Sequence, residues 1–331
     1  MLTKQKFPKS ILKKILSGFD LGKLKEIKPL ATSGNITSIT KTNRNNYLLR
    51  LCPTGERWRS KEEIAGELEL INRLLKNKFP VPKPIADKNG GFIISWKNHF
   101  GYLRNFINGS PKLNPNPKEI RKFCELIGRF HNLVKNYKTK NKREHIWDLK
   151  ETREYFQKKK GLILKSDFKN KREFVEKMAK ELSLLNFPED LPLGTIHEDL
   201  GKRHVIWQKD EILGIIDFDR SYYGKLVFDL GEACRGWCFI NNWRTWSNKN
   251  FRAFINGYQN KRKLTKIEKK YLADAIKFGI LERALSFCLR FIEVTRDPED
   301  EKFAWHSISE RGLFGMVNMN KKKIEKIIKI A

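Results

Sequence analysis

Strand-like and helix-like patterns occupy different parts of this 331-residue chain, and this separation constrains the fold most. Short apolar runs typical of strands are confined to the first 106 residues and to one island at residues 194–217. One long helix, predicted over residues 60–77, interrupts the first group, and Ser60 with Glu63 forms a capping box at its start. After about residue 117 the apolar spacing is helical. Strands and helices segregated in this way predict an α+β fold.

The expected elements divide the chain into two lobes, at residues 1–105 and 106–331. In the first lobe, strands are expected at 24–32, 36–41, 47–52, 92–96 and 100–106, after a helix at 8–18. In the second lobe, helices are expected at 117–136, 148–158, 170–186, 228–240, 248–260, 265–291 and 302–315. Residues 320–331 have the pattern of an amphipathic helix, which we expect to dock on the protein surface.

The chain is strongly basic, with 68 Lys and Arg against 38 Asp and Glu and a formal net charge of +30. A charge of this size raises the possibility of an anionic partner, such as RNA or a membrane surface. The basic residues are spread along the chain, however, and no basic stripe is interleaved with aromatic residues. We therefore expect a solvated basic surface, with no specific nucleic-acid partner and no membrane association.

Cysteine usage and apolar runs bear on the cellular location. The five cysteines are odd in number and form no C-x-x-C pair, which predicts reduced thiols and no zinc site. The chain begins Met-Leu-Thr-Lys without the apolar core of a signal peptide, and no apolar run approaches the roughly 20 residues of a membrane span. The expectation is a cytoplasmic protein.

The strand island carries the residue types that phosphoryl transfer needs. Asp199 follows a short apolar strand, His204 comes five residues later, and Asp217 ends a second apolar strand. Transfer of a phosphoryl group needs a carboxylate to accept the proton of the acceptor hydroxyl, and hard ligands that hold Mg²⁺. Asp199 and Asp217 suit these two roles. Taken singly, Asp199 is better explained as a turn cap and His204 as a packed core residue.

Taken together, these residues resemble a known family. His197 to Asp219 resembles the H-x-D-x-x-x-x-N loop and the following I-D-F of the aminoglycoside phosphotransferase and choline kinase superfamily, which is related to the protein kinases. Gly224-x-x-x-x-Asp229-Leu-Gly resembles the family's G-x-x-x-x-D-L-A. The resemblance implies a bilobal protein kinase-like fold that uses ATP and Mg²⁺. It implies that Asp199 is the catalytic base, Asp217 a metal ligand and Asp229 a structural carboxylate.

One position departs from the family pattern. His204 stands where most members have Asn, although macrolide-type phosphotransferases also carry His there. By position, His204 is expected to be the second metal ligand. Because Mg²⁺ prefers oxygen ligands, a nucleotide-binding pseudokinase without turnover is an alternative.

The first lobe resembles the nucleotide-binding lobe of the same family. Tyr47-Leu-Leu-Arg50 resembles the strand that carries a cation to the phosphates, and Glu67 on the following helix is expected to pair with Arg50. Glu63 is the rival partner. By the same resemblance, the remaining residues of the nucleotide site are Ser33, Gly34 and Asn35 in a phosphate-covering turn, and Leu103 and Asn105 in the hinge strand that reads adenine.

Longer similarities narrow the resemblance to bacterial homoserine kinases of this fold. They include residues 19–30, 191–197 and 254–265, and Arg235-Gly-Trp-Cys in place of N-D-W-C. Homoserine is therefore the leading acceptor, with Arg235, Trp237 and Asp219 expected at the acceptor site. Arg235-Gly236 stands where these kinases have Asn-Asp, so their acidic residue is missing here. An arginine suits an acidic acceptor better than an ammonium group. Other hydroxyl metabolites, and aminoglycoside- or macrolide-type antibiotics, are alternatives.

Overall fold

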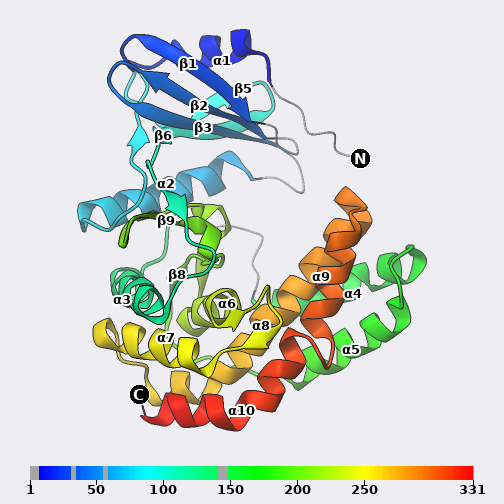
Figure 1. Cartoon of the computed structure of the whole chain (residues 1–331). Helices are drawn as coiled ribbons and strands as arrows, with labels where there is room; N and C mark the ends of the chain where they lie inside the picture. Colours follow the sequence, from blue (N-terminus) through cyan, green and yellow to red (C-terminus); the bar gives the residue numbers. More distant parts are fainter. Residues whose placement is uncertain (1–6, 31–34, 55–58, 141–147, 331) are drawn as a thin grey trace.

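The computed structural model describes residues 7–30, 35–54, 59–140 and 148–330, which form two lobes (Figure 1). The smaller lobe is built on an antiparallel sheet in the order β1-β2-β3-β6-β4, and β5 also pairs with β6. Its strands are β1 (Leu24–Leu30), β2 (Ile36–Thr42), β3 (Asn46–Pro53), β4 (Pro84–Ile85), β5 (Ile94–Trp96) and β6 (His99–Asn105). The larger lobe is mainly helical, so the predicted two-lobed α+β fold is confirmed.

The two faces of this sheet have different neighbours. Leu49 and Leu103 point to the outer face, where they belong to an apolar cluster with helix α1 (Lys9–Leu16). Because side chains alternate along a strand, Arg50 and Tyr102 point to the opposite face, and the register places them side by side. Arg50 bonds to Asp217 and Tyr102 bonds to Glu67, so this inner face of the sheet faces the larger lobe.

Helix α2 (Lys61–Lys76) connects the lobes from beneath the sheet (Figure 1). The predicted capping box is present: the Ser60 side chain accepts from the backbone N–H of Glu63, and the Glu63 carboxylate accepts from the N–H of Ser60. The apolar residues Leu70, Ile71 and Leu74 of this helix belong to the core of the larger lobe. α2 is thus fixed to the larger lobe while its polar side faces the sheet.

The helices of the larger lobe follow the prediction, except that the helix expected at 148–158 extends to Lys165 and that the C-terminal end differs. They are α3 (Pro117–Val134), α4 (Leu149–Lys165), α5 (Lys171–Leu184), α6 (Leu226–Trp237), α7 (Asn248–Lys261), α8 (Lys266–Arg290), α9 (Pro298–Ile308) and α10 (Leu313–Ile330). The single helix expected over 302–315 is wrong, because the chain turns between α9 and α10. A Cβ at Gly312 would lie 1.7 Å from the His306 carbonyl oxygen, so only glycine fits this turn.

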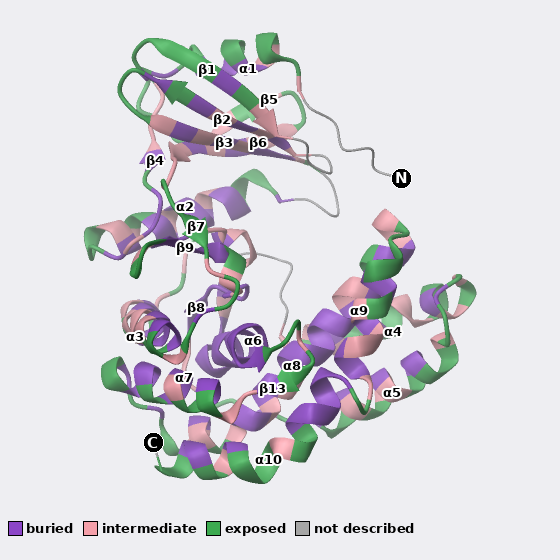
Figure 2. Cartoon of the chain, in the orientation of Figure 1, coloured by how far each residue is buried: buried purple, intermediate pink, exposed green. Residues whose placement is uncertain are grey.

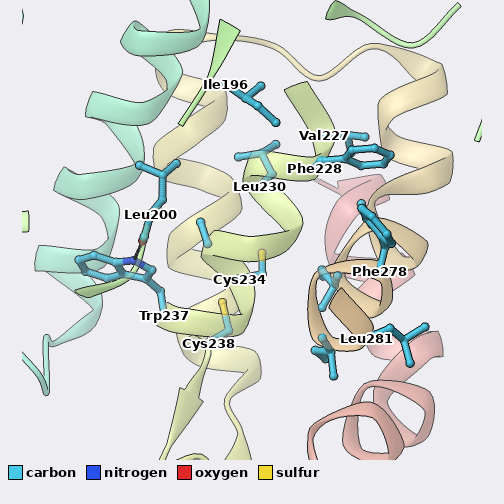
Figure 3. Packing of buried hydrophobic residues seen from close by; sticks show 14 of the residues in the cluster. Ile196, Leu200, Val227, Phe228, Leu230, Cys234, Trp237, Cys238, Phe278 and Leu281 are labelled. Atoms are coloured by element: carbon cyan, nitrogen blue, oxygen red, sulfur yellow. Dashed lines mark hydrogen bonds between the residues drawn. The ribbon is translucent and has the colours of Figure 1, made fainter. Parts of the chain in front are cut away.

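Helices α6 and α8 form the centre of the larger lobe. Every residue of α6 is buried, and Figure 2 shows it enclosed by its neighbours. Gly231 permits this contact, because a Cβ there would lie 2.3 Å from the carbonyl oxygen of Ala275 in α8. Figure 3 shows Leu200 and Phe278 among the side chains that pack around α6. Close packing of this kind gives the loop that contains Leu200 a rigid support.

Short strands complete the larger lobe. β9 (Val205–Gln208) lies between β10 (Glu211–Ile215) and β7 (Ser110–Pro111), β8 (Leu193–Ile196) pairs with β11 (Tyr222–Lys225), and β12 (Phe239–Ile240) pairs with β13 (Thr245–Trp246). The sequence predicted the strand–loop–strand island but neither β11 nor the β12–β13 hairpin. None of the helices in the described parts of the chain has the length and apolar character needed to cross a membrane.

Candidate active site

A buried carboxylate holds the loop that follows β8. Asp229, in the first turn of α6, accepts hydrogen bonds from the backbone N–H groups of His197 at 2.9 Å and Glu198 at 2.6 Å. His131 of α3 donates to the same carboxylate at 3.1 Å, and its other ring nitrogen bonds to the Tyr258 hydroxyl at 2.7 Å. Glu198 has a φ of +68°, a conformation that is unfavourable for a non-glycine residue. Asp229 therefore offsets the cost of a strained loop.

Trp237 supports the same loop from below. Its indole N–H donates to the carbonyl oxygen of Leu200 at 2.7 Å (Figure 3), and its ring stacks on Phe123 with the centroids 3.8 Å apart. The side chain is fully buried. We expected Trp237 at the acceptor site, but the structure places it in the core, where it positions the loop through Leu200.

Trp237→Phe should keep the stacking on Phe123 and delete only the indole donor. The buried carbonyl of Leu200 would lose its partner, so we expect the free energy of unfolding to fall by about 1–3 kcal/mol in urea denaturation. Trp305→Phe is the matched control, because Trp305 donates to the Lys169 carbonyl at 2.9 Å near the surface, where water can replace it. Equal losses in the two variants would contradict a special role for the Trp237 bond.

Asp199 lies between two guanidinium groups. Arg283 of α8 places Nη2 3.2 Å from Oδ1, and Arg203 of the loop places Nη2 3.2 Å from Oδ2. Burial would by itself raise the pKa of this carboxyl, but the positive groups around it, Arg283 foremost, together outweigh burial and hold the pKa of Asp199 well below its ordinary value. Asp199 is therefore ionised at neutral pH, and its oxygens can accept a hydrogen bond from an acceptor hydroxyl.

The lowered pKa of Asp199 predicts how stability depends on pH. A carboxyl whose pKa is lower in the folded state contributes stability above its unfolded pKa of about 4. This contribution is lost as the pH falls through the lower folded pKa. The free energy of unfolding of the wild type should therefore exceed that of Asp199→Asn at pH 5–7, and the difference should shrink between about pH 4 and 2. Urea denaturation at each pH measures it, and a difference that grows toward pH 2 would contradict the lowered pKa.

His204 and Asp217 form a pair of ligands that fits a divalent cation. The His204 Nδ1–H donates to the carbonyl oxygen of Asp199 at 2.7 Å, so its Nε2 carries the lone pair. This Nε2 lies 3.3 Å from Asp217 Oδ2. Neighbouring ligands of an octahedral cation, each at about 2.1 Å, are about 3 Å apart. Within the described residues there is no cluster of three or more His, Cys, Asp or Glu that could hold a metal ion. Substrate oxygens and water would therefore complete the coordination, as is usual for Mg²⁺.

Arg50 reaches from β3 to the same acidic loop. Its Nη1 lies 2.5 Å from Asp217 Oδ1, and its Nη2 lies 2.9 Å from Asp219 Oδ2. Burial would raise the pKa of Asp217, but the charge and hydrogen bond of Arg50 together with His204 outweigh burial and hold that pKa below its ordinary value. The structure thus brings together Arg50, Asp217, His204 and Asp199, which the sequence predicted to converge.

The expected pair between Arg50 and Glu67 does not form. Glu67 instead binds the guanidinium of Arg59 and accepts from the Tyr102 hydroxyl at 2.8 Å. Arg59 immediately precedes the N-cap of α2, and its guanidinium reaches Glu67 on that helix. Arg50 is left to pair with the acidic loop. Glu63, the rival partner, is engaged in the capping box.

The other residues expected at the nucleotide site are less well placed. The side chain of Leu103 is buried in the core of the smaller lobe, and its backbone lies between β3 and β4. Asn105 exchanges hydrogen bonds with the backbone of Lys83 through its own N–H and its side-chain oxygen. Any adenine contact from this segment would therefore come from residues after β6. Ser33 and Gly34 lie outside the described residues, and Asn35 directly precedes β2.

Arg235 and Asp219 do not form a common acceptor site. Arg235 is buried on α6, 2.5 Å from Glu232 Oε1, and the Trp243 ring covers its guanidinium at 5.2 Å. Its guanidinium thus already has a partner one turn earlier on the same helix, a carboxylate that Arg283 also contacts, and this buried pairing weakens the inference that Arg235 favours an acidic acceptor. Asp219 binds Arg50 and lines a cavity of about 160 Å³ beside α2.

Sequence reasoning missed a buried ion network behind Asp199. Arg220 pairs with Glu198 and with Glu282 of α8, the latter at 3.0 Å. Arg283 contacts Asp199 and Glu232, each at 3.2 Å. The network ties the loop of Asp199, the loop of Asp217 and α8 together. The available signal was the placement of charged residues directly beside motif residues, since Glu198 precedes Asp199 and Arg220 follows Asp219.

Comparisons with known proteins agree with this geometry. Residues 27–264 match the model of the phosphotransferase enzyme family. A homoserine kinase of Agrobacterium fabrum (strain C58) is 25% identical over 327 residues, which cover 92% of this chain and 96% of the relative. Among solved structures, an amicoumacin kinase has a TM-score of 0.70 at 16% identity, covering 97% of this chain and 94% of its own. A microcompartment-associated aminopropanol kinase has a TM-score of 0.67 at 14% identity, covering 96% and 99%.

Because the family match spans most of its length, this chain belongs to the phosphotransferase enzyme family. The resemblance to the aminoglycoside phosphotransferase and choline kinase superfamily is confirmed, and so is the homoserine kinase-like sequence pattern. The prediction of an enzyme that phosphorylates an alcohol group of a small molecule is confirmed at the level of this family.

Proposed function

We propose that this chain transfers the γ-phosphoryl group of ATP to a hydroxyl group of a small metabolite, with Mg²⁺ as the metal and homoserine as the leading acceptor. The observation that carries the proposal is the meeting of a carboxylate base, a two-ligand cation site and a cross-lobe guanidinium in one place. Asp199 lies beside His204, His204 Nε2 lies 3.3 Å from Asp217 Oδ2, and Arg50 binds the same Asp217. Homoserine is placed first because the relative from Agrobacterium fabrum, which matches over 96% of its own length, is a homoserine kinase.

In this proposal each lobe supplies different functional residues. Residues 1–105 supply Arg50 for the phosphates, and residues 106–331 supply the base, the metal ligands and the acceptor site. Asp199 would orient the acceptor hydroxyl and take its proton. His204 and Asp217 would hold Mg²⁺, which when bound neutralises the phosphate charge. Arg50 would leave Asp217 and Asp219 for the phosphate oxygens, which also accept a guanidinium in a bidentate manner. The chemistry is then mainly positioning and charge neutralisation.

The buried thiols support a reducing compartment for this activity. All five cysteines are free and buried, which agrees with the cytoplasmic location expected from the sequence.

A screen of ATP consumption tests the proposal. ADP formation is measured with homoserine, other amino alcohols, hydroxy amino acids and aminoglycoside or macrolide antibiotics, and Asp199→Ala serves as the blank. ADP formation above the blank with homoserine supports the full proposal. Turnover with another metabolite would keep the kinase and replace the acceptor, and turnover with antibiotics alone would favour the antibiotic alternative.

The same screen separates a kinase from a pseudokinase. Binding of ATP without Asp199-dependent turnover on any acceptor would favour the pseudokinase. His204→Asn sharpens this point, because it supplies the oxygen ligand that Mg²⁺ prefers. Turnover that appears only in His204→Asn would identify the native chain as a nucleotide-binding protein without turnover.

A further inference from the structure

Arg203 differs from the other arginines at this site in its exposure. Its side chain is 62% exposed, compared with 34% for Arg50 and 6% for Arg283. The carboxylate it contacts in the structure is that of Asp199, whereas Arg283 is shared among several buried carboxylates. Arg203 is therefore the guanidinium that can leave its present contacts at least cost, because exposed ion pairs contribute little stability.

The contacts of Arg203 span the gap across which a phosphoryl group would move. Its Nη2 lies 3.2 Å from Asp199 Oδ2, the oxygen that faces away from Arg283. Its Nε donates to His204 Nε2 at 3.0 Å. One planar group thus touches both the candidate base and a candidate metal ligand. A phosphoryl group in transfer must lie between the acceptor oxygen at the base and the metal-bound phosphates.

The other charges at the site leave a role for Arg203 in neutralising the negative charge of a transferring phosphoryl group. The two candidate protein ligands are one carboxylate and one imidazole nitrogen. Arg220, Arg235 and Arg283 lie behind the loop, where they share the buried carboxylates of Glu232 and Glu282. Negative charge spreads over the oxygens of the transferring group in the transition state, and an arginine aimed there is worth a factor of about 10³–10⁵ in rate.

We propose that Arg203 is a catalytic residue that binds the γ-phosphoryl oxygens during transfer, a role that rests on the proposed kinase function. In that step a bond forms between the acceptor hydroxyl oxygen and the γ-phosphorus, and the bond to the β–γ bridging oxygen breaks. The electron pair of that bond stays on ADP, and the hydroxyl proton passes to Asp199. Arg203 moves from Asp199 Oδ2 and His204 Nε2 to the phosphoryl oxygens, which leaves Oδ2 open to the hydroxyl and Nε2 open to Mg²⁺. Arg283 stays on Oδ1 and keeps the base in place.

The first experiment measures binding rather than turnover. ADP with aluminium fluoride mimics the transferring phosphoryl group, so Arg203→Ala should weaken binding of this pair at least tenfold while the affinity for ADP alone stays within threefold. Arg252→Ala is the matched control, because Arg252 is an exposed arginine on α7 outside the site, and both affinities should stay unchanged in it. Equal losses for ADP and for ADP with aluminium fluoride would make Arg203 a brace of His204 and overturn the proposal.

The second experiment uses turnover and the exposure of the side chain. Arg203→Ala should lower kcat by about 10²-fold or more with the KM for ATP within threefold, and Arg203→Lys should restore only part of the loss. Added methylguanidine should raise kcat of Arg203→Ala and leave the wild type unchanged, since the vacated space is open to solvent. A kcat within threefold of the wild type would overturn the proposal.

The two proposals fail separately. If the wild type shows no Asp199-dependent transfer to any acceptor or to water, the proposed function fails. The comparison of ADP with and without aluminium fluoride still decides whether Arg203 contacts the phosphoryl position.

Discussion

Asp199→Asn is expected to lower kcat by about 10³- to 10⁴-fold while the chain stays folded. The amide cannot accept the proton of the acceptor hydroxyl, and it lacks the charge that orients that hydroxyl. The side chain keeps its shape, so Leu200 and Trp237 beneath it keep their contact. ADP formation at saturating ATP and acceptor gives kcat, and far-ultraviolet circular dichroism reports the fold.

A surface aspartate supplies the control for this substitution. Asp210 lies in the turn between β9 and β10, is 85% exposed and pairs with Lys112 at 3.1 Å. Asp210→Asn makes the same chemical change away from the site and should retain full activity. If Asp199→Asn keeps more than about a tenth of the wild-type kcat, Asp199 is not the base.

The sequence predicted the catalytic residues best where they follow short strands close together in the chain. Asp199 comes shortly after the end of β8, and Asp217 comes shortly after the end of β10, which pairs with β9. The backbone N–H of Ile216 also donates to the His204 carbonyl at 2.9 Å, which brings the two loops together. Local strand pairing therefore sets most of this geometry, and local pairing can be inferred from a sequence pattern.

Contacts between distant elements were harder to predict. Arg50 and Arg59 are both within reach of acidic partners, and the choice between them depends on how β3 lies over α2. The sequence pattern contains no information on that angle. Trp237 and Arg235 were misplaced for a related reason: every residue of α6 is buried, so no polar face indicates which side meets the acceptor.

Asp229 makes contacts of the same long-range kind, and we expect stability to be sensitive to its substitution. It is fully buried and accepts from two backbone N–H groups of the strained loop and from His131. Removing the carboxylate leaves three buried donors without partners, and each unpaired buried group costs about 1–3 kcal/mol. The positive φ of Glu198 would also lose the contact that offsets its strain.

Asp229→Ala should therefore lower the free energy of unfolding by about 3–5 kcal/mol, a large fraction of the stability of a typical domain. Urea denaturation measures the loss, and Asp190→Ala, at an exposed position before β8, should leave stability nearly unchanged. Asp229→Asn separates packing from hydrogen bonding, since it fills the same space but can accept at only one atom. We expect it to recover less than half of the loss. A loss below about 1 kcal/mol in Asp229→Ala would mean that the loop holds its shape without this carboxylate.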